Sequence, residues 1–368
     1  MNKNVLNHPV LAILIFYLIF FFQILNQAGF AQTGISNAIS GRVTDAATNN
    51  PLFNVNVFLA NTTRGAATDK DGTYSIMNIP PGAYDLIVSM MGYELEIIPI
   101  QFTEPQSIQY DIKLRPRVLT GEAVEVTAPV PKEWNNNLKR FQREFLGETE
   151  NAKACHIVNP EVLDFEAGHE SDKFVARTDS TLIVENLSLG YKLYIILLTF
   201  RINKDSLIHA IYPRFEELVP QNEKESGNWQ KAREETYFGS FRHFISALAR
   251  GKVSEEYFDV FALSGHLMAP DQLNIIPGSS ASQKWFYLDA PVMVVYKGLS
   301  QAGKGRFMRE YRTHFPASYI LLRNGYAHID TLGNVLSRFA IIHWGDWHKA
   351  RIADMLPYDY FPDEKIRK

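Results

Sequence analysis

Between residues 38 and 114, apolar and polar residues alternate in short runs, and this alternation constrains the fold more than any other feature of the chain. The clearest run spans Ile108 to Leu114, where every second residue is apolar and the residues between are polar or charged. A side-chain period of two is that of a β-strand with one buried face. Turn formers such as Asp71-Gly72 separate the runs. The pattern predicts an all-β sandwich of seven strands, at residues 38–45, 54–60, 65–69, 73–79, 83–90, 93–101 and 107–114.

The residues in the turns and at the strand ends of this sandwich follow a specific order. They read Gly41-x-Val43-x-Asp45, then Thr68-Asp69-x-Asp71-Gly72-x-Tyr74, then Ile79-Pro80-x-Gly82-x-Tyr84 and Ser89-x-x-Gly92-Tyr93. This order resembles the carboxypeptidase regulatory-like domain family. The resemblance implies a transthyretin-like sandwich, of a kind often grouped with carbohydrate-binding-like folds, and a place in the bacterial cell envelope. It implies no peptidase activity, because the module is the accessory part of the enzymes that carry it.

The first 31 residues predict an export signal peptide. Lys3 gives a positive start, Val10 to Phe22 is an unbroken apolar run, and Gly29 and Ala31 are small residues ahead of a cleavage site. The run is shorter than the roughly 20 residues that span a bilayer, so we expect no transmembrane span after cleavage. An uncleaved anchor is the alternative. The expected location is the periplasm, the outer membrane or the cell surface.

A chain of 368 residues has room for a second folded body after the sandwich. Residues 116–131 contain three prolines and predict a linker. The expected divisions are therefore the signal peptide at 1–31, the sandwich at 38–115, the linker at 116–131 and a second domain at 132–368. The formal net charge is -3 and no basic run is present, which excludes nucleic acid as an expected partner.

The second domain is expected to be α+β, with antiparallel strands and a few segregated helices. Apolar residues at helical spacing predict one helix from Trp134 to Phe145 and a longer one from Glu223 to Arg250. Strands are expected at 181–202, 207–212, 257–263 and 291–296, and a hairpin is expected in which 319–330 and 335–344 flank Gly333-Asn334. The aromatic and apolar tail at 352–360 is expected to dock on the domain.

Three segments of this second domain, Leu189 to Leu193, Tyr237 to Phe244 and Arg351 to Tyr360, carry a further resemblance. They resemble the uncharacterised region that often follows the same module in bacterial envelope proteins. This resemblance supports the domain boundary and implies no activity.

The sequence lacks the standard zinc carboxypeptidase site. Such a site needs a His-x-x-Glu pair and a distant histidine, so that three ligands hold the metal. No histidine in the chain has glutamate three residues later, and His343-x-x-Asp346 offers a carboxylate one methylene shorter. We therefore expect no metal and no cofactor. The lone Cys155 cannot form an internal disulfide and is expected to be a buried, inert thiol.

The segment from His343 to His348 is the densest group of potential ligands. Two imidazoles and the Asp346 carboxylate suggest a metal site, whereas Trp344 and Trp347 suggest a platform for sugar rings. The structural interpretation is favoured over both, because large aromatic residues at strand ends usually cap a core.

Ser240 and His243 lie one helical turn apart and form a candidate nucleophile–base pair. The nucleophile-elbow pentapeptide Gly-x-Ser-x-Gly is absent. Close helix packing at Gly239-Ser240 explains the same residues without catalysis.

Two functions stay open. The favoured one is an exported, non-catalytic envelope protein, in which the sandwich is an accessory module and the α+β domain binds a protein partner or a glycan. The alternative is a hydrolase of unrecognised type, whose weak catalytic candidates are Ser240, His243, His343, Asp346 and His348. Convergence of these side chains in one pocket would favour the hydrolase, whereas dispersal would favour binding.

Overall fold

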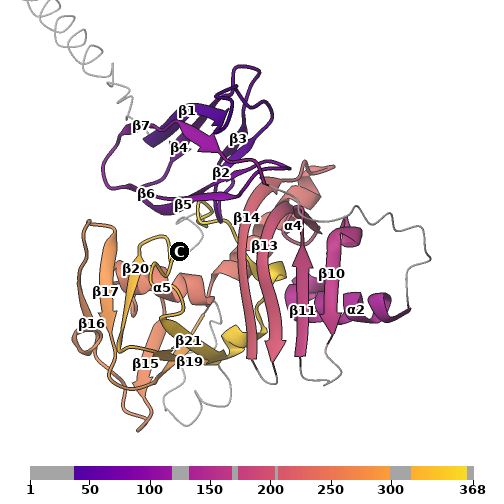
Figure 1. Cartoon of the computed structure of the whole chain (residues 1–368). Coiled ribbons are helices and arrows are strands. Elements are labelled where there is room, and N and C mark those ends of the chain that lie inside the picture. The colour runs from indigo at the N-terminus through magenta and orange to yellow at the C-terminus, as the bar shows by residue number, and fades with distance from the viewer. Residues whose placement is uncertain (1–36, 118–131, 168–172, 204–205, 299–315, 363–368) are drawn as a thin grey trace, which may run out of the picture. The chain divides into compact units, whose positions relative to one another are not determined.

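The structure is a computed structural model that describes residues 37–117, 132–167, 173–203, 206–298 and 316–362. These residues are mostly strand, with an N-terminal β-sandwich, several antiparallel sheets and, within the described ranges, four α-helices (Figure 1). The predicted fold class, an all-β sandwich followed by an α+β region, is confirmed. The predicted signal peptide and nearly all of the predicted linker lie outside the described residues, so the domain limits stay a prediction.

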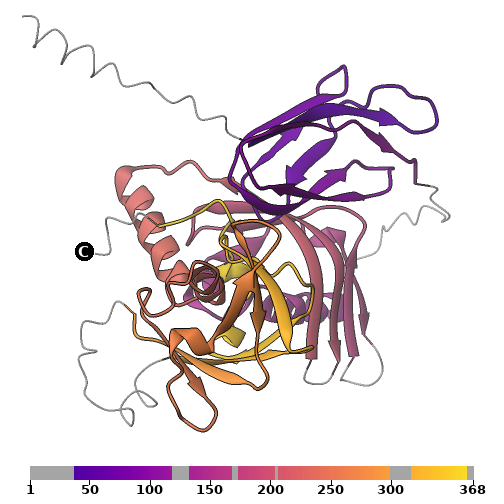
Figure 2. The same ribbon diagram turned by 90° about the vertical axis from the view of Figure 1, so that its left-hand side faces the viewer.

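The sandwich consists of two sheets with one hydrophobic core (Figure 2). One sheet contains β1 (Asn37–Asp45), β4 (Thr73–Ile79), β7 (Ser107–Gln109) and β8 (Ile112–Leu114), and the other contains β2 (Asn56–Leu59), β3 (Gly65–Ala67), β5 (Gly82–Ser89) and β6 (Glu96–Phe102). Alternate side chains such as Ile39, Val57 and Leu86 are fully buried in the core. Burial of each such side chain contributes about 1.5–3 kcal/mol.

The last predicted strand, 107–114, is two strands, β7 and β8, that both pair in parallel with β1. Between them the Arg42 amide donates to the Asp111 carboxylate, at 2.9 Å, instead of to a backbone carbonyl. A Cβ on Gly41 would lie 2.0 Å from the Tyr110 carbonyl oxygen. The backbone pairing of β1 with the β7–β8 segment is therefore interrupted at Gly41, where the two segments approach so closely that only glycine fits.

The first part of the C-terminal region is a six-stranded sheet around its own hydrophobic core. Its strands are β9 (Cys155–Ile157), β10 (Leu163–Ala167), β11 (Lys173–Thr178), β12 (Leu182–Asn186), β13 (Tyr191–Asn203) and β14 (Ser206–Glu217). Strand β13 pairs with β11, β12 and β14, which confirms the central position predicted for it.

Two helices precede this sheet, α2 (Lys132–Leu146) and the short α3 (Glu150–Lys153). The predicted apolar stripe of α2 is confirmed, since Phe141 and Phe145 are buried against Phe200 of β13. Their ring centroids lie 4.8 Å and 5.8 Å from that of Phe200. Aromatic pairs at such distances stabilise a core beyond the area that they bury.

The predicted long helix, 223–250, is two helices, α4 (Glu223–Tyr237) and α5 (Phe241–Ala249). Gly239 has a φ of +80°, a left-handed conformation that ends α4. Ser240 then caps α5, because its Oγ accepts a hydrogen bond from the backbone amide of His243 at 3.1 Å. The expectation of one continuous helix was wrong because a helix stop and a helix start lie side by side.

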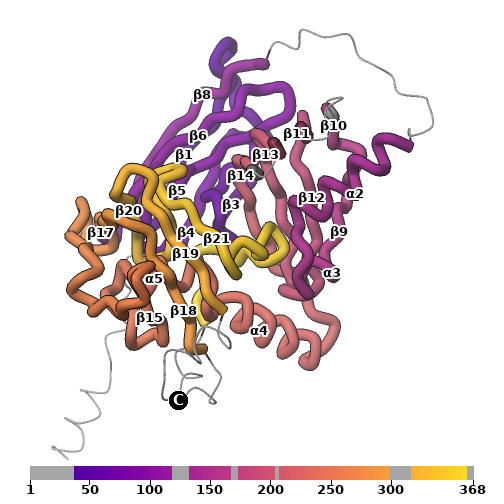
Figure 3. Tube along the Cα trace, turned by 90° about the horizontal axis from the view of Figure 1, so that it is seen from below, coloured from indigo at the N-terminus to yellow at the C-terminus, as the bar shows by residue number. Residues whose placement is uncertain are grey.

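The second part of the C-terminal region contains two smaller antiparallel sheets. One has β15 (Phe258–Ala262), β18 (Val292–Tyr296), β19 (Ala317–Leu322) and β21 (Ile341–Gly345), and the other has β16 (Asn274–Pro277), β17 (Gln283–Tyr287) and β20 (Tyr326–Asp330). Both contribute to a hydrophobic core that they share with α5, which lies beside β15 and β20 (Figure 3). Short 3₁₀ helices span Pro160–Val162, Pro270–Gln272, Asp346–Lys349 and Ile352–Asp354.

The predicted hairpin around Gly333-Asn334 was wrong in its pairing. The segment 319–330 bends at Gly325 into β19 and β20, which belong to different sheets. Strand β21 pairs with β19 rather than with β20. Around the turn itself a single bridge remains, between Ile329 and Val335.

The tail is docked, as predicted. The half-buried Arg242 of α5 donates hydrogen bonds to the carbonyl oxygens of Pro357 and Tyr360, at 2.7 Å and 2.8 Å. The Tyr358 amide donates to the Asn61 carbonyl oxygen at 2.6 Å. The tail therefore joins the C-terminal region to the turn between β2 and β3 of the sandwich.

Candidate binding cleft and predicted site residues

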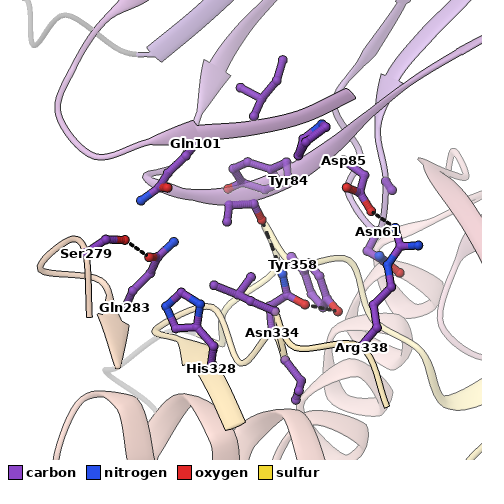
Figure 4. Close-up of a pocket in the computed structure, with 16 residues that line it drawn as sticks. Asn61, Tyr84, Asp85, Gln101, Ser279, Gln283, His328, Asn334, Arg338 and Tyr358 are labelled. Atoms are coloured by element: carbon purple, nitrogen blue, oxygen red, sulfur yellow. Dashed lines mark hydrogen bonds and ion pairs between the residues drawn. The ribbon is translucent and has the colours of Figure 1, made fainter. Parts of the chain in front are cut away.

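A cleft of about 400 Å³ lies where the sandwich meets the C-terminal region (Figure 4). Strands β5 and β6 form one wall, and β17, β20 and the segment after β20 form the other. Its polar lining comprises Asn61, Tyr84, Asp85, Gln101, Ser279, Gln283, His328, Asn334, Arg338 and Tyr358. A volume of this size is typical of sites for small ligands.

The C-terminal wall is held in place by a turn built on Asp330. The Oδ1 atom of this buried carboxylate accepts hydrogen bonds from the amides of Leu332 and Asn334, both at 3.0 Å. Asn334 is thereby aimed at the sandwich, where its Nδ2 donates to the Ala83 carbonyl oxygen at 3.4 Å. The Tyr358 hydroxyl donates to the Asn334 Oδ1 atom at 3.3 Å. The turn therefore connects both walls of the cleft.

One end of the cleft carries a bound pair of opposite charges. Arg338 lies 3.3 Å from the Asp85 carboxylate and donates to the Tyr212 hydroxyl at 2.8 Å. Since each charge has the other as a partner, this end offers a ligand little net charge.

At the other end, three uncharged polar side chains face one another, and each has at least one hydrogen-bonding atom unused among the described residues. Gln101 comes from β6, whereas Gln283 and His328 come from the opposite wall (Figure 4). Among the described residues, the Gln101 side chain makes no hydrogen bond, and Gln283 uses only its Oε1, which accepts from the Ser279 hydroxyl at 2.6 Å. His328 Nε2 is buried and lacks a partner within the same set. Gln283 and the His328 Nε2 atom are buried, where polar atoms are normally paired, whereas Gln101 is exposed. The unused atoms of the three side chains are suited to receive a polar ligand.

In the C-terminal wall of the cleft, burial shifts the pKa values of His328 and Asp330 in the directions that favour their uncharged forms. Burial lowers the pKa of His328 from its ordinary value. Burial also raises the pKa of Asp330 to about 6, although the three backbone amides around the carboxylate and the Arg242 charge oppose the shift.

The structure places Ser240 and His243 in separate structural roles. Ser240 is the α5 cap, and its Oγ contacts the backbone rather than the ring of His243. His243 is buried, with Nδ1 accepting from the Gly239 amide at 3.0 Å and Nε2 lying 2.7 Å from the Glu256 carboxylate. Arg250 pairs with the other oxygen of Glu256, at 3.0 Å. The imidazole thus belongs to a buried ionic cluster.

The residues from His343 to His348 are not brought into one site. His343 stacks on Phe241, with ring centroids 4.6 Å apart, and burial lowers its pKa to about 4. Asp346 accepts from the Ala317 amide at 2.9 Å and pairs with a lysine. His348 is exposed beside Arg351. Across the described ranges, no three histidine, cysteine or acidic side chains are grouped to hold a metal.

The two predicted sugar-stacking indoles differ in exposure. Trp347 is buried, and its Nε1 donates to the Gly239 carbonyl oxygen at 2.7 Å, so it closes the core. Trp344 is partly exposed and stacks on Tyr319, with ring centroids 5.3 Å apart. Neither residue lines the cleft.

Sequence reasoning missed the cleft residues Gln101, Gln283, His328 and Asn334. They come from the sandwich and from separate points of the C-terminal region, with no common spacing along the chain. Only tertiary folding brings them together.

Comparison with known proteins gives limited likeness over the chain as a whole. A search of curated protein sequences finds no match. One similar solved structure is a type II cohesin–X-dockerin complex from Acetivibrio cellulolyticus, with 19% identity, a TM-score of 0.18 and coverage of 21% of this chain. This chain spans 56% of that cohesin–dockerin chain.

Two further similar structures come from Bacteroides. One, from Bacteroides fragilis, is described as a "putative membrane-associated protein of unknown function", with 12% identity, a TM-score of 0.18 and coverage of 50% of this chain and 84% of the other. The other, from Bacteroides uniformis, is described as a "putative carbohydrate binding protein", with 10% identity, a TM-score of 0.19 and coverage of 80% and 98%. TM-scores this low support no argument about fold or function.

The sequence of the sandwich gives a definite match. Residues 39–126 match the sequence profile of the CarboxypepD_reg-like domain family, which covers the sandwich and continues into the predicted linker. The resemblance found from the turn residues is confirmed. The N-terminal sandwich of this chain is therefore similar to CarboxypepD_reg-like domains.

Proposed function

We propose that this protein is an exported, non-catalytic binding protein of the bacterial cell envelope, in which the sandwich and the α+β region together hold a polar ligand. The observation that supports this proposal is the cleft in which Gln101, Gln283 and His328 face one another with unused hydrogen-bonding atoms. A ligand that satisfies such atoms gains more than one that binds to an already paired surface.

The arrangement of the weak catalytic candidates supports binding rather than hydrolysis. His243 is engaged with Glu256, Asp346 with a backbone amide and a lysine, and Ser240 with a helix terminus. A nucleophile needs a base within hydrogen-bond reach and a space for substrate beside both. None of these side chains lines the cleft.

Export is part of the proposal and is supported by the N-terminal sequence alone. The positive start, apolar run and small residues of the first 31 positions are typical of a cleaved signal peptide. Within the described residues, no helix has the length and apolar character to cross a membrane.

The test is retention of envelope material by the protein. The full chain is produced with its own N-terminal segment in a Gram-negative host, purified from the envelope fraction, immobilised, and exposed to solubilised envelope glycans and proteins. We expect a retained component that is lost in Gln101→Ala and kept in the control Gln109→Ala, since both glutamines are exposed on strands of the sandwich but only Gln101 lines the cleft. Recovery of the chain in the cytoplasm, or equal retention by both variants, would overturn the proposal.

A further inference from the structure

The outward face of the three-stranded sheet β16–β17–β20 is covered with aromatic rings. The register pairs Trp285 with His328 and Tyr287 with Tyr326 across β17 and β20. The Trp285 and His328 rings are stacked, with centroids 4.4 Å apart, and Tyr326 packs against Trp285 at 5.7 Å and Tyr287 at 6.2 Å. Tyr326 is 42% exposed, whereas the inward Phe286 between Trp285 and Tyr287 is fully buried. We call the surface formed by Trp285, Tyr287, Tyr326 and His328 the ring face. It lies on the outer side of the sheet and is not part of the hydrophobic core.

This ring face is continuous with the cleft. Gln283, Trp285 and Tyr287 alternate along β17, and their side chains point to the same side of the sheet. Tyr326 and His328 alternate in the same way along β20. Gln283 and His328 line the cleft, while the rings beyond them extend the same surface outward. From Gln283 to Tyr287 this surface is about 13 Å long, at roughly 3.3 Å per residue.

The chemistry of the combined surface fits an uncharged, hydroxyl-rich ligand. The ring face offers flat aromatic surface, and the cleft offers amide groups that both donate and accept hydrogen bonds. Burial keeps His328 neutral near pH 7 by lowering its pKa. The arginine that lines the cleft, Arg338, is already paired with Asp85 and hydrogen-bonded to Tyr212. An anionic ligand would find no unpaired cation among the cleft residues that the structure describes.

We propose that the cleft and the ring face bind one extended, uncharged glycan chain, whose terminal sugar hydrogen-bonds to Gln101 and Gln283 while the following sugars stack on Trp285 and Tyr326. This inference rests on the proposed function and adds the ligand class. Apolar faces of sugar rings lie against the aromatic side chains, and their hydroxyl groups satisfy the amides. The extended surface requires that affinity rise with chain length until the ring face is filled.

The experiment titrates the full chain with neutral oligosaccharides of increasing length from three series, β-linked glucose, N-acetylglucosamine and α-linked mannose, by calorimetry. We expect tighter binding of longer members in at least one series. Tyr326→Ala should weaken binding of the longest member about two- to tenfold and leave binding of the shortest member unchanged, because only the longest member reaches this aromatic contact. Gln101→Ala should weaken every length. Tyr110→Ala is the matched control, since Tyr110 is 41% exposed and lies on the sandwich outside the cleft.

The controls separate failure of the inference from failure of the proposed function. Far-ultraviolet circular dichroism and thermal unfolding of each variant establish that it is folded. Affinity that does not change with length, or tighter binding of polygalacturonate or heparin than of neutral chains, would overturn the inference. Retention of an envelope protein that is lost in Gln101→Ala, with no glycan bound, would overturn the glycan ligand and leave the binding function standing. Absence of any retained material would overturn both.

Discussion

Thr63 and Asp359 lie 296 positions apart in the sequence and are joined by two hydrogen bonds. The Thr63 amide donates to Oδ1 at 3.0 Å and its hydroxyl donates to Oδ2 at 2.5 Å. The Arg64 Nε atom lies 3.1 Å from the same carboxylate, as an ion pair without hydrogen-bond geometry. The turn between β2 and β3 of the sandwich is thereby locked to the C-terminal tail. The same turn pairs with β14, because the Asn61 amide donates to the Pro213 carbonyl oxygen at 2.7 Å.

This lock predicts that Asp359→Ala destabilises the protein by about 2 kcal/mol. The Asp359 side chain is only 3% exposed, and its removal leaves the amide and hydroxyl of Thr63 without partners. Unpaired buried donors cost about 1–3 kcal/mol, and partial exposure of Arg64 reduces the contribution of the ion pair. Urea unfolding followed by tryptophan fluorescence measures the change. Asp179→Ala, which removes an exposed carboxylate, should change the free energy of unfolding by less than about 0.5 kcal/mol. Equal effects of the two substitutions would contradict the lock.

Substitution of Arg242 should lower the free energy of unfolding by more than substitution of Asp359 does. The half-buried guanidinium of Arg242 donates to four backbone carbonyl oxygens, those of Leu332, Pro357, Tyr358 and Tyr360, at 2.7–3.0 Å. Lysine cannot reproduce this planar fork, because its ammonium is a single point charge. An ammonium offers three donors to four acceptors, and each hydrogen bond to a charged group contributes about 1.5–3 kcal/mol, so Arg242→Lys should lower the free energy of unfolding by about 3 kcal/mol. It should also make the tail accessible to proteases.

Limited proteolysis and urea unfolding measure the two consequences. The exposed Arg201 on β13 supplies the matched control, Arg201→Lys, which should behave like the unmodified protein in both assays. A tail that stays protected in Arg242→Lys would show that the four carbonyl contacts do not hold it.

Asp330 predicts a distinct pH dependence of stability. Burial raises the pKa of this carboxyl from 3.8 to about 6, so the folded state holds its proton more tightly than the unfolded state. The carboxyl therefore favours folding most below pH 4, and this contribution is lost as the pH rises to 6. The shift corresponds to about 3 kcal/mol at about 1.36 kcal/mol per pKa unit. Asp330→Asn keeps the Oδ1 acceptor and removes the titration.

The measurement is the difference in free energy of unfolding between the unmodified protein and Asp330→Asn from pH 4 to pH 7. The difference should shift in favour of Asp330→Asn as the pH rises, because only the unmodified protein must bury a charge. Asp271→Asn, which changes an exposed carboxyl, serves as the control. Parallel curves for the unmodified protein and Asp330→Asn would refute the raised pKa.

The sandwich was predictable from sequence because its signals are local. Alternation with a period of two and the turn at Asp71-Gly72 depend on neighbouring residues alone. The break between α4 and α5 also has a local signal, a glycine followed by a capping serine at Gly239-Ser240. It was missed because apolar residues at helical spacing continue on both sides of it. By contrast, the pairing of β21 with β19 depends on long-range packing, which periodicity does not encode.

The cleft could not be predicted, because its residues share no spacing and no chemical motif. Gln101 and Gln283 are ordinary strand residues in the sequence, and only the fold places them across a common space. His243 and Trp347 were predicted as site candidates because histidine and tryptophan are rare and lie here close to other reactive or aromatic residues in the sequence. In the structure the same side chains complete buried clusters. In this protein, clusters of histidine, tryptophan and acidic residues along the sequence therefore indicate buried structural contacts rather than the candidate site.

His343 predicts a pH dependence of the opposite sign to that of Asp330. Burial lowers its pKa from 6.5 to about 4, and its Nδ1 is buried without a partner in the described part of the chain. The neutral ring stabilises the fold above pH 6.5, and this stability is lost as the pH falls to 4, since the unfolded chain takes up the proton first. His343→Phe keeps the stacking on Phe241 and removes the titration. At about 1.36 kcal/mol per pKa unit, its stability relative to the unmodified protein should be about 3 kcal/mol higher at pH 4 than at pH 7. Unfolding curves at both pH values test this, with the exposed His266→Phe as control. A metal bound by His343 would reverse the result, because the substitution would then lower stability most at pH 7, where the imidazole is free to bind, and chelator would abolish that difference.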